Sequence, residues 1–206
     1  MTLTPRPHDL LWLSADSALL SVNEGWVSEQ WHAGLPVVVR RDVVRADRIP
    51  VGVRGARREQ RAAAWVQAAD ILRVTTPERV AERACLLASP FVAFPPVQAA
   101  LALSELSWPW RWGITGSVGY ALATAIPVLH SGSDLDLTIR APQPLARDLL
   151  QQWQAQTERL PCRVDTQVET PSGAFALSEW LRDGRALVKT AAGPLLTTSP
   201  WSRETL

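Results

Sequence analysis

The strongest constraint on the fold is the alternating stretch Asp134-Leu-Asp-Leu-Thr-Ile139 in the second half of the chain. Alternation with a period of two is typical of a β-strand that has one apolar and one polar face. The leucines and Ile139 can pack into a core, whereas Asp134 and Asp136 share the opposite face. The stretch therefore predicts a strand that is buried on one side and carries two carboxylates on the other.

Two carboxylates held side by side repel each other, and a bound cation relieves that repulsion. Mg²⁺ prefers hard oxygen ligands and is typically held by one or two carboxylates together with the phosphates of a substrate. A D-x-D pattern on its own is also typical of a merely solvated strand face. The choice between a metal site and a solvated strand face therefore depends on the residues around the pattern.

Gly116-Ser117 lies upstream of the carboxylates, with seventeen residues from the serine to Asp134, and a helix-compatible stretch of small residues, 118–125, follows it. A Gly-Ser turn at the start of a helix offers backbone N–H groups and a hydroxyl to phosphate oxygens. Ser133 ends a second small turn, Ser-Gly-Ser, directly before the carboxylates. A phosphate cradle next to a metal-binding strand indicates phosphoryl or nucleotidyl transfer.

The overall composition limits the other classes of function. The 206 residues are 47% apolar and 20% charged, as in soluble globular proteins with one large or two small domains. The net charge of +1 gives no electrostatic reason to expect a nucleic-acid or membrane partner. Cys85 and Cys162 form neither a metal spacing nor a disulfide framework, which favours a reducing cytoplasm. Neither a signal peptide nor a transmembrane helix is expected, because no apolar run is long enough.

The first part of the chain predicts a β-rich region over residues 8–58, with short apolar runs separated by turn residues. The stretch 59–72 instead predicts a helix, because apolar residues recur there at helical spacing. Clustered guanidinium groups can bind phosphate oxygens, although a solvated basic rim is the alternative that spacing leaves open. The clustered residues are Arg40, Arg41, Arg54, Arg57, Arg58 and Arg61.

A second helix is predicted to begin at Thr76-Pro77-Glu78, since Thr is a common N-cap and Pro a common first helical residue. Ser89-Pro90 is expected to end it, and residues 91–96 form the best candidate linker. We therefore predict two domains, an N-terminal substrate- or partner-binding domain over 1–90 and a catalytic domain over 91–206.

The rest of the chain alternates between predicted helices and strands, which indicates an α+β fold. The fold expected is a small β-rich N-terminal domain with helices, followed by a mixed sheet with helices packed on one side. The alternate tryptophans at 108, 110 and 112 are expected to bury one face of a strand, although stacking on a base is the alternative. Further elements are expected at 95–106 (helix), from 144 (helix), 162–169 (strand), 177–181 (helical turn) and 186–190 (strand), with a turn at Gly193-Pro194.

The block from Gly116-Ser117 through a short helix to Asp134-Leu-Asp136 resembles the hallmark of the polymerase-β-like nucleotidyltransferases. In that superfamily a third carboxylate lies on a neighbouring strand, and Asp165 stands in the matching place here. The interval between turn and carboxylates is longer than the usual one, and residues 127–133 can absorb the difference as a loop.

Further stretches extend the resemblance over nearly the whole chain. They resemble the malonate decarboxylase holo-acyl-carrier-protein synthases, also called phosphoribosyl-dephospho-CoA transferases. The stretches are Arg6 with His8–Leu13, 36–41, 49–52, Arg54-Gly55, Gln60-Arg61, 164–171 and 188–190.

This resemblance implies transfer of 2′-(5″-phosphoribosyl)-3′-dephospho-CoA from its triphosphate precursor to a serine of the acyl-carrier-protein subunit of malonate decarboxylase, with release of diphosphate. Two Mg²⁺ ions on Asp134, Asp136 and Asp165 would clamp the attacking and leaving oxygens. Candidates for binding the phosphates are Gly116, Ser117, Ser133, Arg54, Arg58 and the only lysine of the chain, Lys189.

Two other functions fit parts of the pattern. Asp134-Leu-Asp-Leu-Thr138 matches the D-x-D-x-T of haloacid-dehalogenase phosphatases, in which the first Asp becomes phosphorylated. That motif follows a hydrophobic strand, whereas His130-Ser-Gly-Ser133 precedes the carboxylates here. A non-catalytic module that binds a carrier protein is the second alternative, and the presence of all three carboxylates argues against it.

Overall fold

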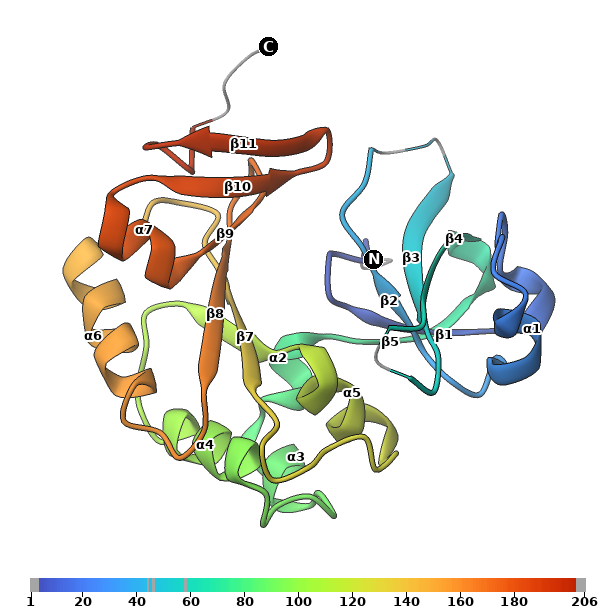
Figure 1. Ribbon diagram of the computed structural model, residues 1–206, viewed down its shortest axis with the longest axis horizontal. Helices are drawn as coiled ribbons and strands as arrows, with labels where there is room; N and C mark the ends of the chain where they lie inside the picture. The colour runs from blue at the N-terminus through green and yellow to red at the C-terminus, as the bar shows by residue number, and fades with distance from the viewer. Residues whose placement is uncertain (1–3, 44, 46, 58, 203–206) are drawn as a thin grey trace. The chain divides into compact units, whose positions relative to one another are not determined.

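The computed structural model describes residues 4–43, 45, 47–57 and 59–202. The chain divides into two compact units, Met1–Thr76 and Pro77–Leu206, each with its own hydrophobic core. Both contain a sheet and helices, so the α+β fold predicted from the sequence is confirmed (Figure 1).

The first unit is built on a five-stranded antiparallel sheet in the order β4-β3-β2-β1-β5. Its inward side chains form one apolar cluster that includes Leu11, Val37 and Val51, each fully buried. The strands are β1 (Leu10–Leu13), β2 (Val37–Val39), β3 (Arg48–Arg54), β4 (Arg61–Gln67) and β5 (Ile71–Thr75), and the helical elements are η1 (Asp16–Ala18), α1 (Trp26–Gln30) and η2 (Ala68–Asp70).

The helix predicted over 59–72 is wrong, because this stretch forms β4, η2 and β5. Ala62, Ala64 and Val66 recur at every second position as well, and all three are buried. The structure follows this period of two, because β4 is a strand that pairs with β3 along its whole length, from Arg54↔Arg61 to Arg48↔Gln67. Sheet pairing thus overrides the helix propensity of the alanine run.

The second unit is built on a six-stranded mixed sheet in the order β11-β10-β9-β8-β7-β6 (Figure 1). Among the described strands of this sheet, β7 and β8 form the one parallel pair, and α6 connects these two strands. The strands are β6 (Arg111–Ile114), β7 (Leu135–Arg140), β8 (Val164–Glu169), β9 (Ala174–Ala176), β10 (Ala186–Thr190) and β11 (Gly193–Thr197). Gly193-Pro194, expected as a turn, begins the edge strand β11.

The helices of the second unit begin close to the predicted residues. Prolines begin α2 and α4, as their missing N–H and fixed φ favour. The helices are α2 (Pro77–Val80), α3 (Arg83–Leu87), α4 (Pro95–Ser104), α5 (Gly116–Thr124), α6 (Arg147–Thr157) and α7 (Leu177–Asp183). None of the helices in the described residues is long and apolar enough to cross a bilayer.

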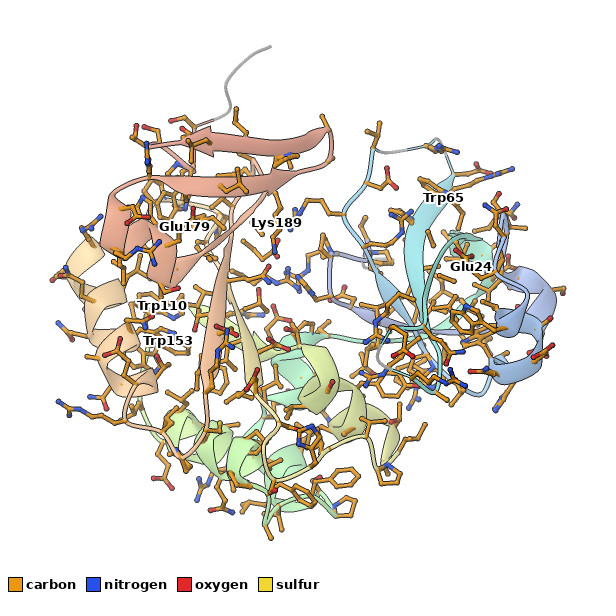
Figure 2. The ribbon with its side chains drawn as sticks, viewed as in Figure 1. Glu24, Trp65, Trp110, Trp153, Glu179 and Lys189 are labelled. Carbon is orange, nitrogen blue, oxygen red and sulfur yellow. The ribbon has the colours of Figure 1, made fainter. Side chains whose placement is uncertain are left out.

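One face of the six-stranded sheet carries the core of this unit. Leu135, Leu137 and Ile139 of β7 are completely buried there, as the alternating pattern predicts. Trp153 of α6 lies on the same face and donates a hydrogen bond from Nε1 to Thr166 Oγ1 of β8, 3.0 Å away. Its ring meets those of Trp108, Trp110 and Trp112 edge-on, and all four rings lie in or against the core of this unit, as the structural interpretation of the alternate tryptophans predicts. Figure 2 labels Trp110 and Trp153.

The other face of this sheet is partly covered by α2. A Cβ atom added to Gly113 of β6 would lie 2.3 Å from the carbonyl carbon of Pro77, so only glycine allows this approach. Glu78 of α2 accepts a 2.8 Å ion-paired hydrogen bond from Arg140 of β7, and both side chains are largely buried. These contacts tie α2 to the second unit, and the structure divides the chain after Thr76 rather than at the predicted residue 90.

Candidate functional site

The turn between β6 and α5 lies directly against the strand that carries the carboxylates. Thr115 donates a backbone hydrogen bond to Asp136 O, 2.9 Å away, which extends the β6–β7 pairing by one residue. Gly116 follows in the left-handed region, with φ of 63°. A Cβ atom at Gly116 would lie 1.9 Å from Asp136 Oδ2, so this position has room only for glycine.

Helix α5 begins at this turn and is held tightly against β6. A Cβ atom on Gly119 would lie 2.6 Å from the carbonyl oxygen of Ile114, which again excludes a side chain. Because a helix leaves its first N–H groups without helical acceptors, the start of α5 presents donors and positive dipole character near Asp136. Ser117, the second residue of α5, is half-buried at this point.

The three predicted carboxylates lie at the same edge of the sheet. Asp136 of β7 is the direct register partner of Asp165 of β8 in the parallel pair, so their side chains leave the same face. Asp134 directly precedes β7. The side chains of Asp134 and Asp165 are 43% and 47% exposed, which leaves both accessible to solvent. The structure thus confirms that Asp165 lies on the strand next to Asp136.

Arg163 reaches between two of these carboxylates, a feature that the sequence analysis missed. Its Nη2 lies 2.8 Å from Asp165 Oδ2, and its Nη1 lies 3.9 Å from Asp134 Oδ2. The hydrogen bond with Asp165, and then the charges of Asp165, Asp134 and Asp136, raise the pKa of Arg163 above its usual value. The available signal was its position two residues before Asp165, which places both side chains on one face of a strand.

The carboxylates are not arranged around a shared point in this structure. Among the residues that the structure describes, no three or more His, Cys, Asp or Glu side chains form a group ready to hold a metal ion. Asp165 instead directs an oxygen to the guanidinium of Arg163. The donor set itself consists of hard carboxylate oxygens on adjacent strands, which suits Mg²⁺.

The pKa of the neighbouring Cys162 is also affected by the negative charge of the site. Burial, and then the charge of Asp134, raise the pKa of its thiol, while a backbone hydrogen bond from Leu135 opposes them. A thiol that stays protonated is a poor nucleophile and a poor metal ligand. The raised pKa therefore makes the Cys162 thiol less reactive than an ordinary cysteine thiol.

Ser133 closes the turn that precedes the carboxylates. Its Oγ accepts a hydrogen bond from His130 N, 3.0 Å away, and its N–H donates to His130 O at the same distance. The residue is 7% exposed. Ser133 therefore shapes the loop that enters β7, and a role toward phosphate remains a prediction.

Lys189 lies on the carboxylate face but not beside the carboxylates. Lys189 pairs with Ala174 of β9, and Ala174 pairs with Glu169 of β8. Lys189 is therefore level with Glu169, which lies four residues beyond Asp165 on β8. That offset is about 13 Å along the strands and about 10 Å across them. The side chain is exposed on β10 (Figure 2).

Thr138, which the sequence analysis considered only within the D-x-D-x-T pattern, is buried next to the carboxylates. It lies on β7 two residues beyond Asp136 and pairs with Gln167 of β8 and Gly113 of β6. It is 1% exposed, and its Oγ1 has no hydrogen-bond partner among the residues that the structure describes.

The arginines of the first unit collect mainly on one hairpin. Arg54 and Arg61 are direct partners across β3 and β4, and Arg57 lies in the connecting loop. The expected helix start is wrong here, because β4 begins at Arg61. Arg40 is engaged within its own unit, donating to Val51 O and pairing with Asp42 at 2.8 Å. Arg58, also predicted to bind phosphate, lies outside the described residues.

A glycine turn and helix start beside carboxylates on adjacent strands define a transferase of the nucleotidyltransferase type. Comparison with protein families identifies the particular family. Residues 86–200 match the model of the phosphoribosyl-dephospho-CoA transferase MdcG C-terminal domain, and residues 6–77 match that of its N-terminal domain. The chain belongs to the phosphoribosyl-dephospho-CoA transferase family.

Individual relatives agree over almost the whole chain. A phosphoribosyl-dephospho-CoA transferase of Klebsiella pneumoniae (strain 342) is 67% identical over 204 residues, covering 99% of this chain and all of the relative. Proteins of the same name from Azotobacter vinelandii and Pseudomonas putida are 44% and 42% identical, covering 97% and 96% of this chain and 95% and 96% of the relatives. No solved structure matches the chain.

The family also decides between the alternative functions. The residues that lead into Asp134 form a loop and a turn rather than the hydrophobic strand that a haloacid-dehalogenase motif requires. The matching relatives are named as transferases, which contradicts both a phosphatase and a non-catalytic binding module.

Proposed function

We propose that this enzyme transfers 2′-(5″-phosphoribosyl)-3′-dephospho-CoA from its triphosphate precursor to a serine of the acyl-carrier-protein subunit of malonate decarboxylase. The serine oxygen bonds to the phosphorus nearest the ribose, the bond to the departing diphosphate breaks, and the hydroxyl proton is released. Such a displacement accumulates negative charge on the leaving oxygens, which the site has to stabilise.

One observation carries this proposal: the register pair Asp136↔Asp165 lies directly beside the glycine turn that begins α5. This arrangement supports the proposal of a cation site next to an anion site. A substrate triphosphate needs both, because its oxygens bind a metal ion on one side and N–H donors on the other.

The carboxylates Asp134, Asp136 and Asp165 are the residues that would hold Mg²⁺. When bound, Mg²⁺ supplies positive charge for the attacking and leaving oxygens of an in-line displacement. Gly116 leaves the space that the Asp136 carboxylate occupies. Ser117 and the first N–H groups of α5 bind the terminal phosphates.

More distant cations serve the rest of the substrate. The precursor is long, with a triphosphate at one end and the diphosphate of the CoA moiety near its middle. Lys189 lies about 16 Å from Asp165 by strand geometry, which suits a distant part of the same substrate better than the reacting phosphates. Arg54 and Arg58 are proposed to bind an acidic partner, either the precursor or the carrier subunit.

The test is to mix the pure protein with the triphosphate precursor, Mg²⁺ and the carrier subunit, and to weigh the carrier by mass spectrometry. The wild-type protein should add the mass of the transferred group to one serine. Asp134→Asn and Asp136→Asn should each retain less than about one-tenth of the rate, a barrier increase above about 1.4 kcal/mol. Asp148→Asn, an exposed position on α6, should react like the wild type.

Asparagine has nearly the shape of aspartate and lacks its charge, so the midpoint of urea unfolding should hold or rise in Asp134→Asn and Asp136→Asn. It should stay unchanged in the control Asp148→Asn. A folded Asp136→Asn protein that keeps most of its rate would rule out the carboxylate assignment. A wild-type protein that modifies no carrier serine would rule out the acceptor.

A further inference from the structure

Arg163 occupies the place beside the carboxylates where a cation is expected. Its guanidinium bonds Asp165 at 2.8 Å and lies 3.9 Å from Asp134, on neighbouring strands. The charge of Asp136 also stabilises it. One monovalent group thus lies beside two carboxylates of the proposed metal site.

The backbone of Arg163 is fixed, whereas its side chain is not. Leu135 of β7 donates a backbone hydrogen bond to Arg163 O, 2.9 Å away, which ties the start of β8 to the start of β7. The side chain is 70% exposed. Exposed ion pairs are weak, because water screens the charges and ordering long side chains is unfavourable. The guanidinium can therefore leave Asp165 without any change in the pairing of β7 and β8.

We propose that Arg163 is an exchangeable counter-ion of the carboxylates, which competes with the divalent cation in the substrate-free protein and moves aside when the cation binds. This inference rests on the proposed role of Asp134, Asp136 and Asp165 as metal ligands. It accounts for the absence, among the described residues, of a ready three-ligand group. Asp165 directs its oxygen to the guanidinium instead.

The exchange couples metal binding to the arrival of substrate. While Arg163 stays on Asp165, a metal ion has to displace it, so the free protein binds the ion weakly. A planar guanidinium also binds phosphate oxygens in a bidentate manner. An incoming triphosphate therefore offers Arg163 a new anionic partner and brings its own bound cation to the carboxylates.

The experiment measures the affinity of the full-length, substrate-free protein for Mn²⁺, with free Mn²⁺ followed by electron paramagnetic resonance. Arg163→Gln should bind Mn²⁺ about fivefold more tightly than the wild type, the change expected when the ion no longer has to break one ion pair between two unit charges at about 4 Å in water. Arg163→Lys keeps the charge and should stay near the wild type. Arg159→Gln, an exposed position with the same change in net charge, is the matched control and should also stay near it.

A further pair of variants separates this inference from the proposed function. Asp165→Asn should abolish Mn²⁺ binding both alone and together with Arg163→Gln. If Asp165→Asn abolishes binding but Arg163→Gln binds no more tightly than the wild type, the counter-ion role is wrong and the metal site stands. Weaker binding by Arg163→Gln would show that Arg163 positions the carboxylates, and this too overturns the exchange. If Asp165→Asn binds Mn²⁺ as tightly as the wild type, both the metal site and the counter-ion role are wrong.

Discussion

At the scale of single residues, the site depends on the absence of a side chain at Gly116. Gly116 and Gly184 both adopt the left-handed conformation, with φ of 63° and 68°. The two positions differ in the space for a Cβ atom. An added Cβ atom would clash with the Asp136 carboxylate at Gly116, whereas at Gly184 it would have no neighbour within 4 Å. Substitutions at these two glycines therefore distinguish the free-energy cost of backbone strain from the cost of displacing the Asp136 carboxylate.

We predict that Gly116→Ala abolishes transfer while Gly184→Ala leaves it unchanged. Both variants should lose about 1 kcal/mol of stability from the left-handed backbone. Only Gly116→Ala has to shift Asp136 as well, so its stability loss should be larger and its metal affinity lower. Urea unfolding and the mass-spectrometric transfer assay check the two effects. Equal activity in both variants would remove Gly116 from the site.

At the scale of elements, the parallel pair β7–β8 brings the acidic residues together, and the β3–β4 hairpin gathers the arginines. Arg54 and Arg61 stand directly opposite each other on that hairpin. Like charges in this arrangement destabilise a sheet. A bound anion would reduce this repulsion.

We predict that Arg54→Ala combined with Arg61→Ala raises the KM for the precursor or for the carrier subunit and leaves kcat unchanged, because uniform binding is lost. Added salt should raise the same KM in the wild type, since exposed charges are screened within about 10 Å at 0.1 M. Arg48→Ala at the opposite end of β3 is the control and should change neither constant. Unchanged kinetics for both substrates in the double variant would make the hairpin a solvated basic rim.

At the scale of the whole molecule, the chain consists of two units with separate cores. Segment 77–90 contributes to the second core, because Leu86 of α3 and Ala81, which directly follows α2, are members of that core. The short segment 77–90 therefore decides whether the catalytic unit is complete.

We predict that a fragment over residues 77–206 unfolds cooperatively in urea, whereas a fragment over 91–206 does not. The shorter fragment loses Leu86 from the core and the ion pair between Glu78 and Arg140. Losing one buried Leu side chain alone costs about 2–5 kcal/mol, a large share of the stability of a small domain. Circular dichroism with urea titration compares the two. Cooperative unfolding of the shorter fragment would move the boundary back toward residue 90.

Local patterns in the sequence determined much of the second unit. The alternation in Asp134–Ile139 defines β7 and its buried face, and prolines mark the starts of α2 and α4. The Gly-Ser turn predicts the start of α5. These features depend on side-chain periodicity and on backbone preferences of Gly and Pro, which neighbouring residues alone decide.

Tertiary structure alone decided the remaining features. The alanine run in β4 fits a helix and a strand equally, and pairing with β3 selects the strand. The register that sets Asp136 against Asp165 comes from hydrogen bonds between strands far apart in the sequence. The same register brings Arg163 to the carboxylates and leaves Lys189 well away from them. Such distances depend on long-range pairing, which no local pattern encodes.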